Sequence, residues 1–118
     1  FFHLNSLKLL NHKKKYDLIW IDGAHGYPTV SIDIINSLNM IKDNGIILCD
    51  DVVVNLNHIN SDRMYSSIAS FETLNALQKQ NLIKFNLIYK RLNAEDNCIE
   101  NKRKFIAFVK KIWHFRNK

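Results

Sequence analysis

Two apolar stretches, each ending in aspartate, decide the fold: YDLIWIDGAHGY at residues 16–27 and NGIILCDDV at residues 44–52. Residues 18–21 and residues 46–49 are unbroken apolar runs. They lack the polar alternation of a strand that has one face in water. Continuous runs of this length are typical of strands buried on both faces of a parallel sheet. The sequence therefore predicts an α/β domain with two parallel strands.

Helical spacing between these stretches predicts a helix that connects the two strands. Pro28 can occupy the first turn of a helix, where its missing N–H is not needed. The residues that share one helical face are Val30, Ile34, Leu38 and Ile41. We expect the helix to end near residues 43–45, where Asn44 or Gly45 can adopt the left-handed conformation. Residues 16–51 are thus predicted to form a strand–helix–strand crossover.

The rest of the chain predicts one more helix and two more strands. A stripe of apolar residues with period three predicts a helix over residues 66–80. Residues 82–92 and 105–112 are strand-like, and no helix separates them. This order predicts an antiparallel hairpin at the edge of the sheet. The remaining segments are interpreted as the end of a helix (residues 3–11), a polar surface loop (52–65) and a polar connection (93–103).

Acidic residues follow both predicted parallel strands: Asp22 the first, Asp50 and Asp51 the second. Ligands of open α/β sheets bind outside the carboxyl ends of the strands, so these three carboxylates should meet if the strands are neighbours. Close carboxylates repel unless a cation lies among them, and oxygen ligands suit Mg²⁺, Ca²⁺ or Mn²⁺. His25 is a candidate general base above the same edge.

Each of these residues also has a structural interpretation. Aspartate at the end of a strand often bonds nearby backbone N–H groups as a turn former or cap. A histidine in a loop is commonly an ordinary surface residue. The coincidence of all four residues at one predicted edge favours the functional interpretation.

Length and composition indicate one globular domain. The chain has 118 residues, of which 47% are hydrophobic. Its apolar runs are far shorter than the roughly 20 residues that span a membrane, so no membrane partner is expected. No export signal opens the sequence. The two cysteines, Cys49 in a predicted buried strand and Cys98, do not suggest a disulfide scaffold, which fits a cytoplasmic protein.

The net charge of +6 comes entirely from residues 100–118, since acidic and basic residues cancel in residues 1–99. A nucleic-acid-binding surface more often places basic residues on a folded face, interleaved with aromatic residues. The chain is also rich in Asn, Ile and Lys throughout, so the excess is interpreted as compositional bias. Nucleic acid is therefore not the expected partner, although a basic protein acting through this tail is kept as an alternative.

The two stretches, with the helix that carries Asp33 between them, resemble class I S-adenosylmethionine-dependent methyltransferases. They look most similar to metal-dependent O-methyltransferases of the macrocin O-methyltransferase-like branch. In that branch one strand ends Ile-Asp-Gly-x-His and the next ends Asp-Asp. The resemblance covers residues 16–52 and implies a Rossmann-like doubly wound sheet. The predicted hairpin fits the antiparallel final strands of that fold.

The resemblance also implies roles for individual residues. Asp22, Asp50 and Asp51 would be ligands of Mg²⁺ or another divalent cation, and His25 would take the proton of the acceptor hydroxyl. Gly23 and Ala24 would pass close to the donor, S-adenosylmethionine, while the 52–65 loop would lie over the acceptor. The implied reaction is direct, metal-assisted O-methylation of a small hydroxylated molecule, with a sugar as one option. The sequence leaves the acceptor and the oligomeric state open, a homo-oligomer included.

The family's first strand and its Gly-rich donor loop have no counterpart in this sequence. We therefore expect residues 1–118 to be a single partial domain, the C-terminal half of a methyltransferase. Such a piece should be inactive and poorly stable alone, because its first strand would expose an apolar edge. Two alternatives remain beside the basic protein: a methyltransferase-fold binding module without catalysis, and an enzyme that uses the same fold and metal for other chemistry, such as hydroxylation.

Overall fold

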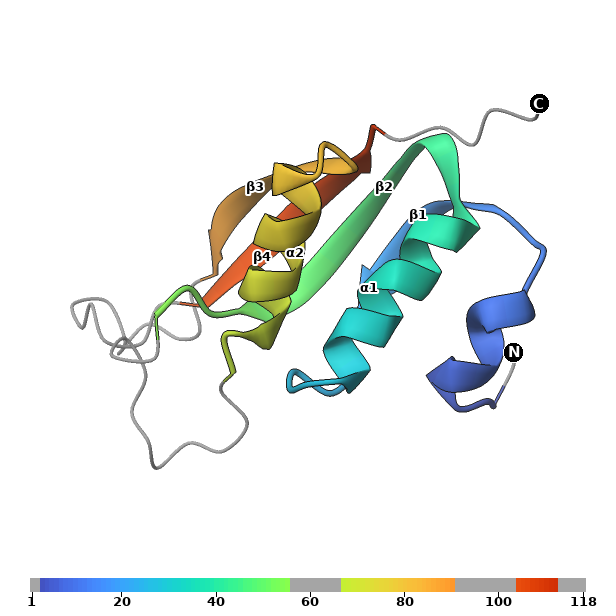
Figure 1. Ribbon diagram of the computed structural model, residues 1–118, viewed down its shortest axis with the longest axis horizontal. Helices are drawn as coiled ribbons and strands as arrows, with labels where there is room; N and C mark the ends of the chain where they lie inside the picture. Colours follow the sequence, from blue (N-terminus) through green and yellow to red (C-terminus); the bar gives the residue numbers. More distant parts are fainter. Residues whose placement is uncertain (1–2, 56–66, 91–103, 113–118) are drawn as a thin grey trace.

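Four strands form one mixed sheet in the computed structural model, which describes residues 3–55, 67–90 and 104–112 (Figure 1). The order of strands across the sheet is β1-β2-β4-β3. β1 and β2 are parallel, whereas β4 is antiparallel to both of its neighbours. The strands are β1 (Tyr16–Ile21), β2 (Ile41–Val52), β3 (Ile83–Lys90) and β4 (Lys104–Lys111).

The helices cover one face of this sheet (Figure 1). α1 (Thr29–Met40) and α2 (Ala69–Lys79) lie side by side, and a 2.8 Å hydrogen bond joins the hydroxyls of Ser31 and Thr73. A short 3-10 helix, η1 (Ser6–Asn11), lies beside α1, where the Asn36 side chain donates to the Ser6 carbonyl at 2.9 Å. None of the helices in the described residues is long and apolar enough to cross a membrane.

The hydrophobic core lies between the helices and the sheet, as the apolar patterns predicted. Val30, Ile34 and Leu38 on α1 are all buried, which confirms the predicted helical face. The strands and α2 contribute further buried residues, among them Ile21, Ile47, Val52, Leu74, Ile83 and Val109. The two apolar runs of the sequence are therefore neighbouring parallel strands joined by a helix.

The predicted end of the first helix is wrong. α1 stops at Met40, and Ile41 is already extended (φ −80°, ψ 139°), with its N–H donating to the Ser37 carbonyl. Ile41 is fully buried and pairs with Tyr16 in the sheet, so the chain must leave the helix before it. Gly45 is not left-handed either.

Gly45 is required for a different reason, the close approach of neighbouring chain segments. The register between β1 and β2 shifts between Tyr16 and Leu18, and the chain folds tightly where β2 begins. A Cβ atom at position 45 would lie 2.6 Å from Ile41 Cγ1 and 2.9 Å from the Asp17 carbonyl oxygen. Only glycine fits this position without displacing backbone or a buried side chain.

The antiparallel pairing of the last two strands confirms the predicted hairpin, and the structure adds their order. β3 is the edge strand, and β4 lies between β3 and β2. The predicted strand over residues 82–92 is described only to Lys90. The predicted connection at 93–103 and most of the predicted loop at 52–65 lie outside the described residues.

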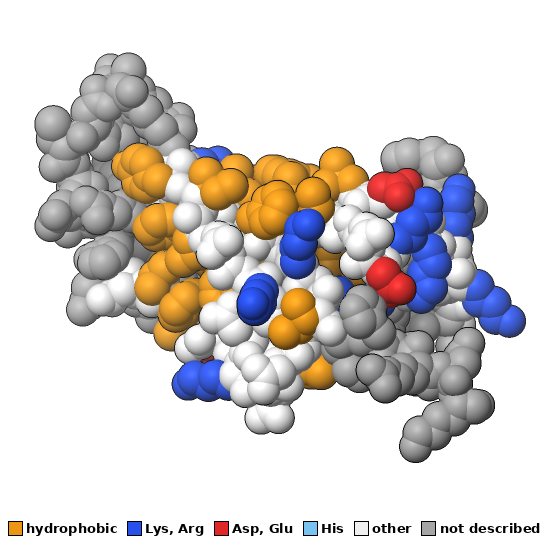
Figure 2. Space-filling model, turned by 90° about the horizontal axis from the view of Figure 1, so that it is seen from above, with side chains coloured by type: hydrophobic (Ala, Val, Ile, Leu, Met, Phe, Trp, Pro, Cys, Tyr) orange, Lys and Arg blue, Asp and Glu red, His pale blue; other side chains and the backbone are white. Residues whose placement is uncertain are grey.

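Large apolar side chains are exposed on the opposite side of β1, which is the other edge strand of the described sheet. Ile19 and Ile21 pack toward the core, whereas Leu18 and Trp20 are 59% and 48% exposed. The predicted burial of this strand on both faces is therefore wrong for the described residues, because no helix among them covers its second face. Ile88 on β3 is also exposed. Figure 2 shows hydrophobic side chains gathered along one side of the molecule, with most of the visible charged side chains at one end.

We predict that Gly45→Ala lowers the stability of the protein by roughly 1–3 kcal/mol, the usual cost of forcing extra atoms into a packed site. Gly26→Ala is the matched control, because a Cβ atom there would meet nothing within 4 Å. Thermal or urea unfolding of both variants measures the difference. Equal stability of the two variants would contradict the packing role of Gly45.

Candidate active site

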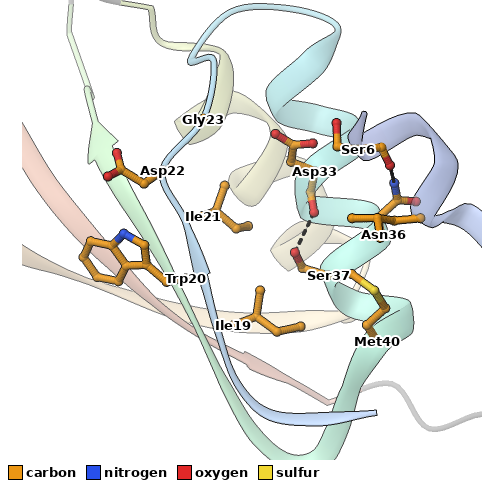
Figure 3. A pocket seen from close by; sticks show the side chains of 11 residues that line it. Ser6, Ile19, Trp20, Ile21, Asp22, Gly23, Asp33, Asn36, Ser37 and Met40 are labelled. Carbon is orange, nitrogen blue, oxygen red and sulfur yellow. Dashed lines mark hydrogen bonds between the residues drawn. The ribbon is translucent and has the colours of Figure 1, made fainter. Parts of the chain in front are cut away.

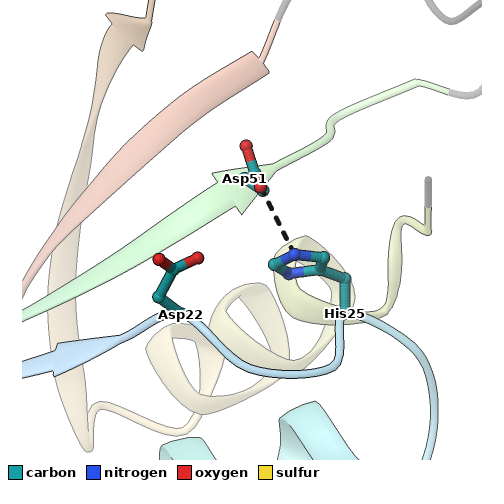
Figure 4. A group of neighbouring side chains, drawn as sticks. All are labelled: Asp22, His25 and Asp51. Carbon is teal, nitrogen blue, oxygen red and sulfur yellow. Dashed lines mark ion pairs between the residues drawn. The ribbon is translucent and has the colours of Figure 1, made fainter. Parts of the chain in front are cut away.

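The carboxyl ends of β1 and β2 lie side by side, because the strands are parallel neighbours with Ile21 opposite Cys49. Asp22 directly follows β1, Asp51 lies near the end of β2, and His25 lies on the loop that leads to α1. One possible ligand atom from each of these three side chains lies within 4.8 Å of the others (Figure 4). The structure thus brings together three of the four residues singled out in the sequence, and their chemical roles stay predictions.

A β-bulge shapes the end of β2. Asp51 has a left-handed backbone (φ 52°), and the register between β2 and β4 shifts between Cys49 and Val52. The Asp50 carboxylate accepts a 2.8 Å hydrogen bond from the Asp51 N–H. Successive side chains of a regular strand point to opposite faces, whereas the bulge allows both carboxylates to reach one cation.

That cation is Lys90, the last residue of β3. Its Nζ lies 2.8 and 2.9 Å from the two carboxylate oxygens of Asp50 and 3.1 Å from Asp51 Oδ1. Lys104 Nζ approaches the same Asp51 oxygen at 3.5 Å, and His25 Nε2 lies 3.3 Å from Asp51 Oδ2. Asp50 is buried and faces Lys90, so it stands apart from the three-residue cluster; its role as a metal ligand stays a prediction.

These contacts favour the charged forms of both partners. Burial raises the pKa of Asp51, but the hydrogen bond from Lys90 and the positive charges of Lys104, Lys90 and, when it is protonated, His25 together bring that pKa below 3.8. Burial lowers the pKa of Lys90, but its hydrogen bonds to Asp50 and Asp51 raise that pKa above 10.5 overall. Both groups are therefore ionised at neutral pH.

Cys49, just before the acidic pair, is a buried free thiol as predicted. Burial raises its pKa to about 12, helped by the negative charges of Asp50, Asp33 and Asp51. The thiolate is the reactive form of cysteine, and this side chain is a neutral thiol at pH 7. Cys49 is therefore a packing residue and not a nucleophile.

A cavity of about 240 Å³ lies beside the cluster, between β1, α1 and η1 (Figure 3). Asp22 and Gly23 line it from the end of β1, and Asp33 lines it from α1. Asp33 Oδ1 is buried and has no hydrogen-bond partner among the residues that the structure describes. As a lining residue, Asp33 also offers the cavity a carboxylate, which can accept an N–H or O–H group of a ligand. Ala24 follows Gly23 on the loop but does not line the cavity.

Sequence reasoning did not single out Lys90 and Lys104. A signal was present, because Lys90 lies near the end of the first predicted hairpin strand (82–92) and Lys104 just before the second (105–112). β4 runs antiparallel to β2, so its first residue lies at the edge where β2 ends. β3 runs antiparallel to β4, so its last residue, Lys90, reaches the same edge opposite Lys104. The missing information was that β4 lies beside β2.

We predict that Lys90→Gln destabilises the protein by roughly 1–3 kcal/mol at pH 7 when divalent cations are absent, because the variant leaves buried Asp50 without its cation. The lowered pKa of Asp51 gives stability that is present above pH 3.8 and lost as the pH falls through the folded-state value. The raised pKa of Lys90 gives stability that is lost above pH 10.5. The difference from wild type should therefore shrink at both extremes.

Urea unfolding across the pH range checks this prediction, with Lys84→Gln, an exposed lysine on the same strand, as the control. A Lys90→Gln difference that is no larger than that of the control at pH 7, or that does not change with pH, would contradict it.

Two comparisons with known proteins gave matches to this chain. Residues 2–52 match a family model described as a methyltransferase domain. A solved structure from Klebsiella pneumoniae, named a "putative O-methyltransferase", matches with a TM-score of 0.60 and 14% sequence identity over 90% of this chain. The chain spans 44% of that protein's length. No curated protein matches the chain.

The solved structure shows the shared fold, a Rossmann-like α/β sheet of the methyltransferase type, which confirms the predicted fold class. The matched residues include β1, α1 and β2, together with Asp22 and His25 between β1 and α1 and Asp51 in β2. The family match is confined to residues 2–52, and the structural match shows the fold alone.

Proposed function

We propose that this chain is the C-terminal part of an S-adenosylmethionine-dependent O-methyltransferase that acts on a small hydroxylated molecule, with a sugar as one option. The observation that carries the proposal is the meeting of Asp22, His25 and Asp51 at the carboxyl end of two parallel strands. The same edge is where ligands of open α/β sheets bind. The match to a methyltransferase domain ends at Val52, the last residue of β2, and so includes this edge.

The exposed face of β1 supports the proposal that this chain is part of a longer protein. β1 is an edge strand of the described sheet, and its Leu18 and Trp20 are largely exposed. The related structure has more than half of its length outside the match. We propose that residues preceding this chain cover β1 and supply the rest of the donor site.

The donor is proposed to lie against the loop at Gly23 and Ala24. Asp33 lines the same cavity from α1, and its carboxylate is the proposed acceptor there for an N–H of the ligand. A Cβ atom at position 23 would come within 3.3 Å of Asp33 Oδ2, so glycine keeps this part of the cavity open. An adenine amino group or the donor's ammonium group has the required N–H.

His25 is proposed as the general base. Its Nε2 lies 3.3 Å from Asp51 Oδ2, and in the neutral tautomer that places the proton on Nε2, Nδ1 is left to accept a proton. This nitrogen would take the proton of the acceptor hydroxyl, whose oxygen would then be free to attack the methyl group that bound S-adenosylmethionine would supply. The new C–O bond would replace the C–S bond of the donor, which would become a neutral thioether. Asp51 stabilises the imidazolium that results.

The possible ligand atoms of the cluster fit a divalent cation. Asp22 and Asp51 offer carboxylate oxygens, and both lie near His25. Asp50 would join them only after releasing Lys90. A cation held there would lower the pKa of the acceptor hydroxyl and orient it. Mg²⁺ is the proposed ion, and Mn²⁺ or Ca²⁺ would satisfy the same oxygens.

We predict that His25→Asn lowers the rate of methyl transfer by about 10²–10⁴-fold, the usual contribution of a general base. Donor affinity should not change, because His25 does not line the cavity. Single-turnover assays with radiolabelled donor and a panel of hydroxylated acceptors, beside donor titration, make the comparison. Full activity of the variant would remove His25 from the mechanism.

We predict that Asp22→Asn in the full-length protein weakens divalent-cation binding by about tenfold or more, and affects donor binding less, although Asp22 lines the cavity, because asparagine has the same shape. The loss of one carboxylate lowers the negative charge of the cluster, while the cavity keeps its shape. Calorimetric titration of Mg²⁺ and of S-adenosylmethionine measures both, and Asp17→Asn, an exposed aspartate on β1, is the control.

The two titrations also separate the proposal from its alternatives. Donor binding without any cation binding would keep the methyltransferase and reject the metal-assisted mechanism. Binding of neither ligand would favour a binding module without catalysis.

A further inference from the structure

The Lys90 ammonium group contacts carboxylate oxygens of two aspartates. Its Nζ contacts both oxygens of Asp50 and one oxygen of Asp51, all within 3.1 Å. The side chains of Lys90 and Asp50 are only 28% and 8% exposed. A charge-assisted network that is this well shielded holds its geometry far better than an exposed ion pair.

The negative charge of the three aspartates at this edge is therefore already largely neutralised by lysines. Asp22, Asp50 and Asp51 bring three negative charges, and Lys90 and Lys104 bring two positive charges. With His25 neutral, one negative charge remains to attract a divalent cation. Attraction for a cation scales with this remaining charge, and a carboxylate lone pair engaged by an ammonium is not free to coordinate a metal.

The two members of the acidic pair differ in position. Asp50 is buried and directs both of its oxygens at Lys90. Asp51 is shared: its Oδ1 faces the lysines and its Oδ2 faces His25, and the residue also belongs to the cluster with Asp22. Asp51 is thus the residue for which Lys90 and an incoming cation compete.

We propose that Lys90 is a resident counter-ion of the acidic pair, which a divalent cation displaces from Asp51 when it binds. The inference rests on the proposed function, since it concerns the cation of that site. Lys90 then limits the affinity for the cation, and metal binding releases an ammonium group at the end of β3. The amine that is released becomes accessible to solvent.

In the first test, Mn²⁺ is titrated into the full-length wild type and three variants. The concentration of free Mn²⁺ is measured by its electron paramagnetic resonance signal. Lys90→Gln is expected to bind Mn²⁺ at least tenfold more tightly than wild type. Lys90→Arg keeps the charge and should show no gain. Lys104→Gln should gain less than Lys90→Gln, because Lys104 contacts one carboxylate oxygen at a longer distance.

A Lys90→Gln affinity equal to or weaker than that of wild type would overturn the inference, as would the absence of Mn²⁺ binding in all four proteins. Titration of S-adenosylmethionine into the same samples keeps the proposed function separate. If S-adenosylmethionine binds but Lys90→Gln shows no gain in Mn²⁺ affinity, only the counter-ion role of Lys90 is rejected. If the wild type does not bind S-adenosylmethionine, the proposed function is rejected.

The second test needs no variant and so does not depend on the folding of one. Wild-type protein is acetylated briefly with acetic anhydride, with and without saturating Mg²⁺, and modification of each lysine is measured by mass spectrometry. Lys90 is expected to react at least threefold faster with Mg²⁺, while exposed Lys84 is unchanged. An unchanged Lys90 rate would overturn the displacement.

Discussion

The parallel pairing of β1 with β2 is the constraint on which the rest of the structure depends. With Ile21 opposite Cys49, both strands end at the same level, and the residues that follow them meet. α1 can connect the strands only if it ends at Met40, because Ile41 is needed in the sheet. The tight approach at Gly45 and the bulge at Asp51 then adjust the two ends of β2 to this pairing.

The bulge gives two consecutive aspartates, Asp50 and Asp51, different contacts. A regular strand would send Asp50 and Asp51 to opposite faces. The left-handed Asp51 instead keeps both within reach of Lys90, while leaving one Asp51 oxygen beside His25 and Asp22. The local strain at Asp51 lies where the proposed chemistry lies, which is the usual place for such a conformation.

The strand–helix–strand unit could be predicted from the sequence because its signals are local. Unbroken apolar runs, helical spacing and the Asp residues that follow the strands all depend on neighbours along the chain. The end of α1 was missed because tertiary pairing of Ile41 with Tyr16 overrides the local Asn-Gly signal. Lys90 and Lys104 were missed because their place depends on β4 lying between β2 and β3, a long-range choice that no local pattern encodes. The unpartnered oxygen of Asp33 likewise depends on packing between α1, β1 and η1.

The central claim is that the edge shared by β1 and β2 binds a divalent cation next to the methyl donor. The most direct measurement is an anomalous-diffraction map from crystals of the full-length protein grown with Mn²⁺ and the demethylated donor, S-adenosylhomocysteine. The account predicts a Mn²⁺ peak within coordination distance of Asp22 and Asp51, Lys90 withdrawn from Asp51, and the thioether close to Gly23. A map with the product bound but no Mn²⁺ peak at these carboxylates, and Lys90 still between Asp50 and Asp51, would contradict it.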